Sequence, residues 1–360
     1  MKTKQAYIIA EAGVNHNGSI EMAKRLIDVA ADCGADAVKF QTFRADKIVS
    51  RGAEKAAYQK RTSGAEESQY TMIKKLELDE RSHEVLLDHC RRRQIQFLST
   101  PFDTDSLNLL ADTLDLPYIK IPSGEITNAP FLLAIARTGK PVIMSTGMST
   151  LGETEQALGI LAFGYLGVDN LPGQEAFAQA YCSAEGQNIV RQKVSLLHCT
   201  TEYPAPFDEV NLQGMDTLKA AFHLSVGFSD HTPGIAAAIG AVARGASIIE
   251  KHFTLDRNLP GPDHKASLEP GELKEMVQAI RQVELAIGQG AKIPAPSEAK
   301  NKTVARKSLV AARPIKKGEL FDVANLTAKR PGTGISPLYY WEWLGKAADR
   351  DYVEDEMIGV

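Results

Sequence analysis

Short apolar runs and longer amphipathic segments alternate along most of the chain. The segments between the runs repeat their apolar positions at helical spacing, as in residues 20–33 and 79–93. Eight runs follow one another: residues 6–10, 37–41, 95–99, 118–121, 141–144, 194–197, 224–228 and 246–249. This alternation predicts eight parallel strands in an α/β fold, a (β/α)₈ TIM barrel over residues 1–287. A doubly wound open sheet is the alternative, but no glycine-rich dinucleotide fingerprint follows the first run.

The seventh and eighth runs each lead into a histidine, His231 and His252. The helical pattern of residues 235–244 connects the two runs, so their strands are parallel and both histidines leave the sheet at the same end. Two imidazoles there can share one metal ion. A structural zinc site wants four protein ligands, so a pair indicates a catalytic metal with open positions. The alternative is that each histidine only forms a hydrogen bond at the end of its strand.

Polar residues also stand near the carboxyl ends of other runs. Lys39 and Gln41 alternate with apolar neighbours and therefore share one face, which in a barrel is the interior. A lysine there needs an anion or a carboxylate as partner. Lys120, Ser123 and Glu125 cluster at the end of the fourth run. Barrel enzymes place their chemistry at the carboxyl ends of strands, so all five residues are candidates for the site.

Four segments depart from the barrel pattern. Residues 43–75 are polar without a clean period and predict an extended loop beyond the second strand. Residues 167–192 also lose the period. They follow a helix and precede a strand, so we expect an irregular insertion on the face away from the chemistry. Residues 288–302 have the composition of a linker, and residues 303–360 predict a small domain with a marginal core of its own.

Composition limits the partners and the location of the protein. Its 360 residues are 44% hydrophobic and 24% charged, with a formal net charge of −4, which is ordinary for an enzyme and argues against a nucleic-acid partner. The sequence has no run of ~20 apolar residues and no apolar signal region, so we expect no membrane partner and a cytoplasmic location. Four cysteines are scattered without paired spacing and are expected to be reduced thiols.

Ten short motifs in order resemble the sialic acid synthase family of nonulosonic acid synthases, over essentially the whole chain. They are Glu11, VKFQT at 38–42, STPFD at 99–103, KIPSGE at 120–125, STGM at 145–148, HCTTEYP at 198–204, FSDHT at 228–232, EKHFTLD at 250–256, PGPDH at 260–264 and KRPGTGIS at 329–336. The resemblance implies a barrel with a small C-terminal antifreeze-like (SAF) domain and a divalent metal, Mn²⁺ or Mg²⁺. The implied reaction condenses phosphoenolpyruvate with an N-acylated mannosamine-type aldose.

The same resemblance assigns roles to individual residues. His231 and His252 become the metal ligands, and Glu125, Glu11 and Lys120 the candidate catalytic residues. Lys39, Thr100, Lys120, Ser123 and Ser229 are placed around phosphoenolpyruvate, and Glu11, Gln41, Tyr203 and Asp263 around the sugar hydroxyls. The resemblance also implies a homodimer in which each SAF domain caps the partner's barrel, with Arg330 at the N-acyl group of the sugar.

One motif departs from the family pattern. Some relatives carry an asparagine where this chain has Thr200 and Thr201, so the phosphate contact expected there has no direct counterpart in the sequence.

Two other functions are open on the residues alone. A Schiff-base aldolase could use Lys39 or Lys120 as its nucleophile inside the barrel. A non-enzymatic glycan-binding protein could use the SAF domain for recognition. The aldose is open as well: N-acetylmannosamine would give N-acetylneuraminate, and 2,4-diacetamido-2,4,6-trideoxymannose would give legionaminate.

Overall fold

The computed structural model describes residues 5–50, 53, 68–168 and 170–359, and the chain divides into two compact units. The first unit is Met1–Gly288 and the second is Gln289–Val360. Each unit has a hydrophobic core of its own. Within the described ranges, no helix is both long enough and apolar enough to cross a membrane.

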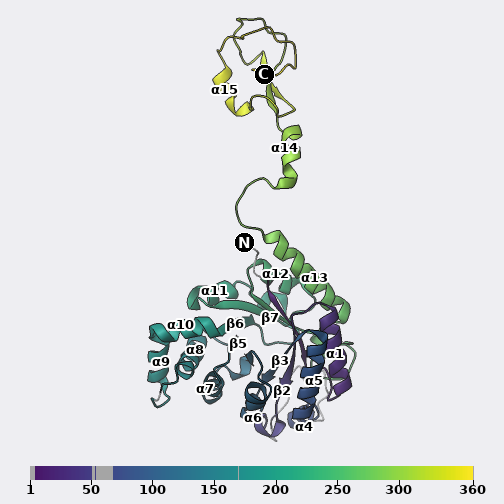
Figure 1. The fold of residues 1–360 in the computed structure, drawn as a ribbon, viewed down its shortest axis with the longest axis vertical. Coiled ribbons are helices and arrows are strands. Elements are labelled where there is room, and N and C mark those ends of the chain that lie inside the picture. The colour runs from purple at the N-terminus through teal and green to yellow at the C-terminus, as the bar shows by residue number, and fades with distance from the viewer. Residues whose placement is uncertain (1–4, 51–52, 54–67, 169, 360) are drawn as a thin grey trace. The chain divides into compact units, whose positions relative to one another are not determined.

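Eight parallel strands form the centre of the first unit (Figure 1). They are β1 Tyr7–Gly13, β2 Ala37–Thr42, β3 Gln96–Pro101, β4 Ile119–Ile121, β5 Val142–Ser145, β6 Val194–Cys199, β7 Ser225–Asp230 and β8 Ile248–His252. Backbone hydrogen bonds join them in the order β3-β2-β1-β8-β7-β6-β5-β4, and β3 also lies against β4, so the sheet closes on itself. The predicted (β/α)₈ TIM barrel is therefore confirmed.

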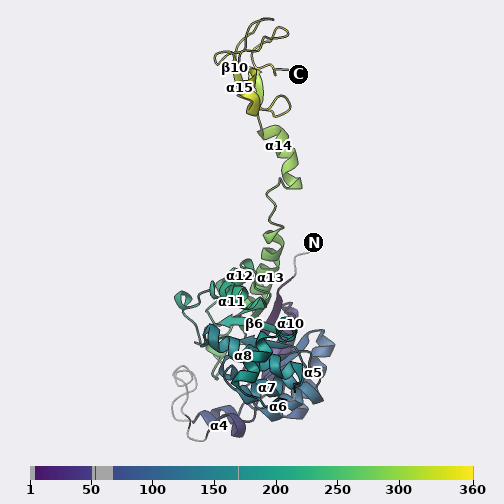
Figure 2. The same ribbon diagram turned by 90° about the vertical axis from the view of Figure 1, so that its left-hand side faces the viewer.

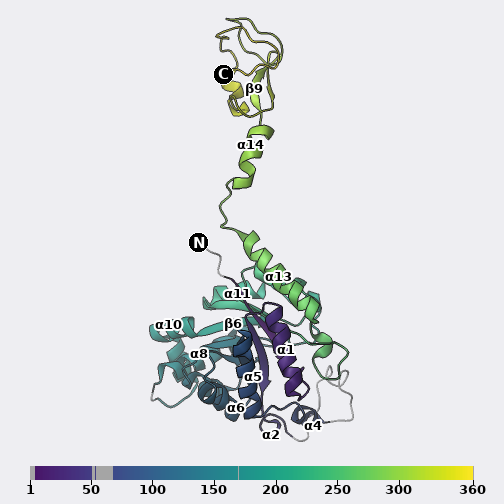
Figure 3. The ribbon, with the colours of Figure 1, turned by 45° about the vertical axis from the view of Figure 1, so that its right-hand side comes forward.

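Helices surround the strands, and Figure 3 shows α1 and α5 side by side on the outside of the sheet. The helices of this unit are α1 Ile20–Asp32, α2 Ala45–Ile48, α4 Gln69–Lys74, α5 Glu80–Arg93, α6 Thr104–Asn108, α7 Ala129–Arg137, α8 Leu151–Leu166, α9 Gln174–Cys182, α10 Ala184–Lys193, α11 Gly214–Phe222, α12 Ala236–Ala243 and α13 Pro270–Ile287. Several begin at a polar cap: Ser19 starts α1, Asp79 starts α5, and Thr150 forms a capping box with Glu153 at α8.

The predicted loop at residues 43–75 contains α2 and α4 in its described part. The remainder of that prediction, residues 51–52 and 54–67, lies outside the described residues. Helix α6 leads directly into a π-helical turn at Leu109–Thr113.

The insertion at residues 167–192 is helical, so the prediction of an irregular segment was wrong. Ser183 separates α9 from α10 and caps α10 by accepting a hydrogen bond from the backbone N–H of Gly186. Both helices pack against α8 (Figure 1), which also lies along α7 (Figure 2) and is buried over most of its length. The two helices bury only Phe177, Ala180, Gly186 and Val190, so the sequence has too few apolar positions there to reveal a helical period.

The interior of the barrel changes from apolar to polar along the strands. One buried cluster consists of Ile9, Ala37, Leu98, Ile143, Leu197 and Ile248. Two positions further along the same strands stand Glu11, Lys39, Thr100, Ser145, Cys199 and Glu250. Side chains alternate between the faces of a strand, so each of these residues points to the same side as its apolar predecessor. The apolar cluster thus closes the interior below a polar region at the carboxyl ends.

The second unit is small and rich in turns. Its strands β9 Ser308–Ala311 and β10 Leu326–Lys329 are antiparallel, and its helices are α14 Ala299–Ala305 and α15 Tyr340–Trp343. Short 3₁₀ turns precede both helices, at Pro296–Glu298 and Pro337–Tyr339. The buried cluster that holds the unit together is Leu309, Ala311, Ile315, Phe321, Leu326, Ala348, Tyr352 and Ile358.

Candidate active site

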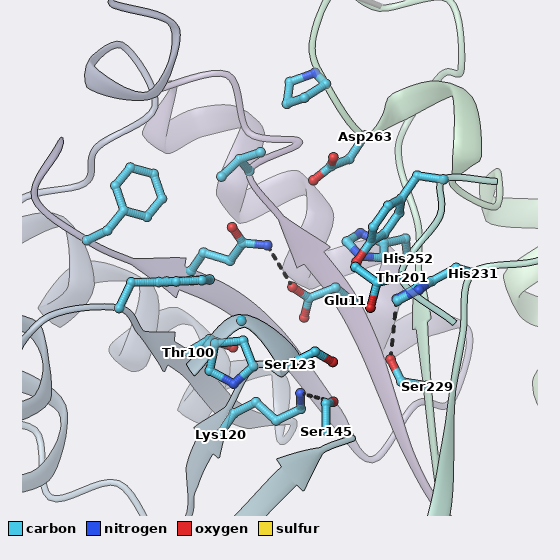
Figure 4. A pocket seen from close by; sticks show the side chains of 18 of the residues that line it. Glu11, Thr100, Lys120, Ser123, Ser145, Thr201, Ser229, His231, His252 and Asp263 are labelled. Atoms are coloured by element: carbon cyan, nitrogen blue, oxygen red, sulfur yellow. Dashed lines mark hydrogen bonds between the residues drawn. The ribbon is translucent and has the colours of Figure 1, made fainter. Parts of the chain in front are cut away.

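A cavity of about 520 Å³ opens at the carboxyl ends of the barrel strands (Figure 4). Every residue of the first unit that the sequence analysis assigned to the site lines this cavity, except Glu125. They are Glu11, Lys39, Gln41, Thr100, Lys120, Ser123, Tyr203, Ser229, His231, His252 and Asp263. The fold therefore brings residues from separate motifs into one chamber.

Two lysines and two carboxylates form what we call the polar floor of the cavity: Glu11, Lys39, Lys120 and Glu250. Lys39 Nζ lies 2.5 Å from Glu11 Oε2 and 3.6 Å from Glu250 Oε2. Lys120 Nζ lies 3.5 Å from Glu250 Oε1. All four residues are buried, so each charge depends on the others for compensation.

Glu250 is a site residue that the sequence analysis missed. It stands in β8 two residues before His252 and lines the cavity with it, and Lys251 between them does not. Its Oε1 accepts a hydrogen bond of 2.9 Å from Ser229 Oγ. The signal was present in the sequence, because the alternation argument used for Lys39 and Gln41 applies equally to Glu250 and His252.

Burial and mutual attraction set the protonation of the polar floor. Burial raises the pKa of Glu11 to about 7, against the opposing effect of Lys39. Burial acts in the same direction on Glu250, but Lys120 and Lys39 outweigh it and lower the pKa of Glu250 to about 2. Burial lowers the pKa of Lys120, whereas in Lys39 the two carboxylates outweigh burial and raise the pKa. Near neutral pH Glu250 is ionised, and Glu11 can gain or lose a proton.

Hydroxyl groups accept hydrogen bonds from both lysines. Lys39 Nζ donates to Thr100 Oγ1 at 2.9 Å. Lys120 Nζ donates to Ser145 Oγ at 2.6 Å, as Figure 4 shows. Ser145 was not among the predicted site residues, although it begins the STGM motif. Ammonium groups beside hydroxyls are suited to bind phosphate and carboxylate oxygens through charge-assisted hydrogen bonds.

Two further hydroxyls, those of Ser123 and Thr201, line the cavity next to Gly147. The backbone N–H of Gly147 donates to Ser123 Oγ at 3.0 Å, and a Cβ at Gly147 would lie only 2.3 Å from Thr201 Oγ1. Thr201 Oγ1 is buried and has no hydrogen-bond partner within the part of the chain that the structure describes. Of the two threonines in the motif that departs from the family pattern, Thr201 thus offers a hydroxyl to a ligand.

His231 and His252 lie side by side at the ends of β7 and β8, with ring centroids 5.7 Å apart. The ring of Tyr203 stacks beside them, 4.2 Å from that of His231. His231 Nδ1 donates to the carbonyl of Thr200 at 2.6 Å, which leaves the lone pair on Nε2. Burial lowers the pKa of both histidines, that of His231 to about 4. Both rings are therefore neutral near pH 7.

This pair fits a divalent cation, because neutral imidazoles are metal ligands. His252 Nδ1 is buried without a hydrogen-bond partner among the described residues, an arrangement that a bound ligand would relieve. The described ranges contain no group of three His, Cys, Asp or Glu side chains able to hold a metal ion. A cation held by the two histidines would complete its coordination with water or substrate, as catalytic sites do.

Asp263 lies in the loop after β8, and hydrogen bonds from distant parts of the chain hold that loop. Asn15 Nδ2 donates to the carbonyl of Phe253 at 2.8 Å and to Ser267 Oγ at 3.0 Å. Ser267 Oγ in turn donates to the carbonyl of Asp263 at 2.7 Å. Burial raises the pKa of the Asp263 carboxyl to about 6. Asp263 therefore presents a titratable oxygen pair to the cavity.

Two predicted site residues do not line the cavity. Glu125 ends the 3₁₀ turn Ser123–Glu125, and its Oε2 accepts a hydrogen bond of 2.6 Å from Asn128 Nδ2. Arg330 belongs to the second unit, where its Nε donates to the carbonyl of Ala305 at 3.0 Å. The roles assigned to Glu125 and Arg330 remain predictions.

Comparison with known proteins follows the same division of the chain. The model of the NeuB family matches residues 26–292, and that of the SAF domain matches residues 306–359. An N,N'-diacetyllegionaminic acid synthase of Campylobacter jejuni is 53% identical over 99% of both chains. An enzyme of the same name from Legionella pneumophila is 44% identical over 92% of this chain and 87% of that protein. The crystal structure of an N-acetylneuraminic acid synthetase from Leptospira borgpetersenii, in complex with citrate, shares 32% identity and a TM-score of 0.67, covering 82% of this chain and 90% of that one.

Proposed function

The chain belongs to the NeuB family, and on that premise we propose that it is a nonulosonic acid synthase that condenses phosphoenolpyruvate with 2,4-diacetamido-2,4,6-trideoxymannose. The reaction class rests on the family, on the near full-length similarity to named synthases and on the site. The choice of aldose, and hence of N,N'-diacetyllegionaminate as product, rests on the names of two relatives, 53% and 44% identical. Neither the Schiff-base aldolase nor the glycan-binding protein is favoured.

The observation that carries the proposal is the pair of lysines beside the pair of histidines in one cavity. Phosphoenolpyruvate is a small anion with a phosphate and a carboxylate. Lys39, Lys120 and the hydroxyls of Thr100, Ser123 and Ser229 supply cationic and neutral donors to both groups. Bound there, the enol carbon of phosphoenolpyruvate would face an aldehyde held at His231 and His252.

In the overall reaction, C3 of phosphoenolpyruvate bonds to the aldehyde carbon of the open-chain sugar, and the aldehyde oxygen takes up a proton. Water then adds at C2, and phosphate leaves with cleavage of its C–O bond. A divalent cation, Mn²⁺ or Mg²⁺, held by His231 and His252 would supply Lewis-acid polarisation of the aldehyde oxygen. The chain's own residues hold both substrates in reacting position and exclude bulk water.

Proton transfer in this reaction calls for a group that can both give and take a proton near neutral pH. Glu11 has this property, because burial raises its pKa to about 7. Its Oε1 also accepts a hydrogen bond of 3.4 Å from Gln41 Nε2, which fixes the carboxyl toward the cavity (Figure 4). We therefore give Glu11 a proton-transfer role in addition to sugar binding, and Glu125 keeps the role that the family resemblance implies.

The test is release of phosphate from phosphoenolpyruvate by the purified protein, with identification of the product. Turnover should require both an aldose and a divalent cation, should be highest with the trideoxy sugar, and should stop with EDTA. Full activity in EDTA, or a lysine adduct trapped by borohydride, would refute the proposal in favour of an aldolase.

We further propose a cytoplasmic homodimer in which Arg330 of one chain completes the site of the other. Mixing a His231→Ala dimer with an Arg330→Ala dimer under subunit exchange tests this. Capping in trans gives each hybrid one intact site, so random reassortment should restore roughly a quarter of parental activity. Capping within one chain leaves every site defective, and no recovery despite exchange would exclude the shared site.

A further inference from the structure

One side of the active-site cavity is apolar. Six side chains that form a separate cluster line it, and we call them the apolar wall: Val14, Phe43, Ile48, Ile73, Leu76 and Phe102. Val14, Phe43 and Leu76 are buried, whereas Ile48, Ile73 and Phe102 are half-buried. The polar groups assigned so far leave this wall without a role.

The wall and the histidine pair occupy different sides of the cavity mouth. Val14, Phe43 and Phe102 follow β1, β2 and β3, Ile48 and Ile73 belong to α2 and α4, and Leu76 follows α4. The histidines stand at the ends of β7 and β8. Glu11 of β1 lies between the two sides, and Figure 4 shows it between Thr100 of β3 and the pair of His231 and His252. A ligand that starts at the histidines and extends across Glu11 and Gln41 therefore ends near the wall.

We propose that the apolar wall receives the terminal carbon of the aldose and selects a methyl group there, so that the enzyme prefers 6-deoxy sugars to sugars with a C6 hydroxyl. This inference rests on the proposed function, because the aldehyde at C1 must lie beside the histidines and the polar floor. C6 is the opposite end of the open chain and points away from them. Glu11, Gln41 and Asp263 are then left to meet the groups along the middle of the chain.

The physical basis is the different cost of placing a methyl or a hydroxymethyl group against hydrocarbon. A methyl group gains from leaving water, in proportion to the apolar area that it buries. A hydroxyl at the same carbon gives up hydrogen bonds to water, and the six apolar side chains of the wall offer no replacement. A pocket of this kind discriminates against an added hydroxyl by about 10–100-fold in kcat/KM.

The test compares two sugars that differ only at C6: 2,4-diacetamido-2,4,6-trideoxymannose and the corresponding 2,4-diacetamido-2,4-dideoxymannose. We expect kcat/KM to be about 10–100-fold higher for the 6-deoxy sugar, with the same KM for phosphoenolpyruvate. Equal kcat/KM values would overturn the role of the wall and leave the synthase proposal standing. Absence of turnover with the trideoxy sugar would instead remove the proposed function and this inference with it.

A polar substitution in the wall should erase the preference. Ile73→Asn changes a half-buried wall residue of α4 to a smaller polar one, and we expect the preference to fall to a few-fold or less without a change in the KM for phosphoenolpyruvate. Ile48→Asn makes the same test from α2 if the first variant does not fold. An unchanged preference in a folded wall variant would overturn the inference.

Two control variants keep the comparison specific. Ile73→Val keeps the wall apolar and should keep the preference. Thr71→Asn adds the same amide to α4 at an exposed residue outside the cavity and should also keep it. Loss of the preference in Thr71→Asn would show that the amide acts through the helix rather than through the wall, and would contradict the proposal.

Discussion

Strands β7 and β8 carry buried polar groups on both faces, but only one face, which we call the inner face, lines the cavity. On the face toward the cavity stand Ser229, His231, Glu250 and His252. On the other face, Asp230 and Lys251 form an ion pair with Nζ and Oδ2 3.0 Å apart and side chains that are 0% exposed. Neighbours in sequence are thus separated into a region open to ligands and a region closed to them.

We call the ion pair of Asp230 and Lys251 the outer pair. It is closed to ligands because neither residue lines the cavity; Asp230 Oδ2 has no hydrogen-bond partner among the described residues and is paired by charge with Lys251 alone. Asp230 Oδ1 accepts hydrogen bonds of 2.8 Å from both the backbone N–H and the hydroxyl of Thr232. Lys251 Nζ donates to the carbonyl of the same threonine. The pair therefore fixes the chain just after His231 and ties β7 to β8 where the two histidines leave the sheet.

On the inner face, two buried polar atoms could still accept or donate a hydrogen bond. His252 Nδ1 and Glu250 Oε2 are buried without hydrogen-bond partners among the described residues, although Glu250 is paired by charge with Lys39 and Lys120. Buried polar atoms without partners are costly, so a ligand that supplies partners gains affinity from them. The comparison teaches that burial alone does not mark a site, whereas burial with unsatisfied polar atoms beside a cavity does.

The largest effect is expected from removing either histidine of the inner face. His231→Ala or His252→Ala should abolish turnover and weaken binding of Mn²⁺, because each removes one of the two proposed protein ligands. The thermal unfolding of the barrel should change little, since both side chains lie at the mouth. Titration calorimetry with Mn²⁺ checks this, and undiminished affinity in either variant would refute the metal assignment.

The second largest effect, a loss of stability, is expected from breaking the outer pair. Lys251→Met leaves Asp230 buried without its countercharge and should lower the free energy of unfolding by about 3–5 kcal/mol. Lys316→Met is the matched control, because it breaks the exposed pair between Lys316 and Asp351, which solvent screens, and should change the free energy of unfolding far less. Denaturant unfolding of both variants measures the difference. Similar losses would show that the outer pair is no more important than a surface pair.

The next largest effect is expected from substituting the lysines of the polar floor. Lys39→Ala and Lys120→Ala should each remove a charge-assisted contact of ~1.5–3 kcal/mol and raise the KM for phosphoenolpyruvate more than that for the sugar. Steady-state kinetics with each substrate varied in turn decides the point. A variant that raised only the sugar KM would contradict the placement of phosphoenolpyruvate on the floor.

The smallest effect concerns Asp263 and the pH dependence of stability. Burial raises its pKa to about 6, so the folded protein keeps this proton at pH values where the unfolded chain has lost it. The free energy of unfolding should therefore fall as the pH rises from about 4 to about 6. We expect a change on the order of 1–2 kcal/mol, less than the full effect, because Asp263 lines an open cavity. Asp263→Asn should lose the share of this slope that Asp263 contributes, while the share of Glu11 remains, and should be more stable than the parent at pH 7.

Glu250 provides the opposite case within the same cavity. Its pKa is lowered to about 2 because Lys120 and Lys39 outweigh burial, so its contribution to stability is present above about pH 4 and is lost as the pH falls toward 2. Unfolding curves between pH 3 and pH 7 for the parent and Asp263→Asn separate the two carboxyls. Equal slopes between pH 4 and pH 6 in the parent and the variant would assign the dependence to another group, such as Glu11.

Much of the fold and part of the site were accessible from the sequence. The alternation of apolar runs and helical segments determined the barrel, because a strand needs only a period of two and a helix a period of 3.6 to be recognised. The same rule placed His231, His252, Lys39 and Lys120 at the carboxyl ends of strands. Applied to β8 as well, it would have found Glu250.

Tertiary structure alone decided the rest. The apolar wall joins residues that are far apart in the chain, such as Val14 and Phe102, and neither carries a local signal. The helices α9 and α10 depend on the surface of α8, because their own apolar residues are too few to define a face. The pKa values of Glu11 and Glu250 diverge in one cavity, although both are glutamates at strand ends. A sequence specifies which groups a strand presents, but distances across the barrel determine which of them pair and which remain open to a ligand.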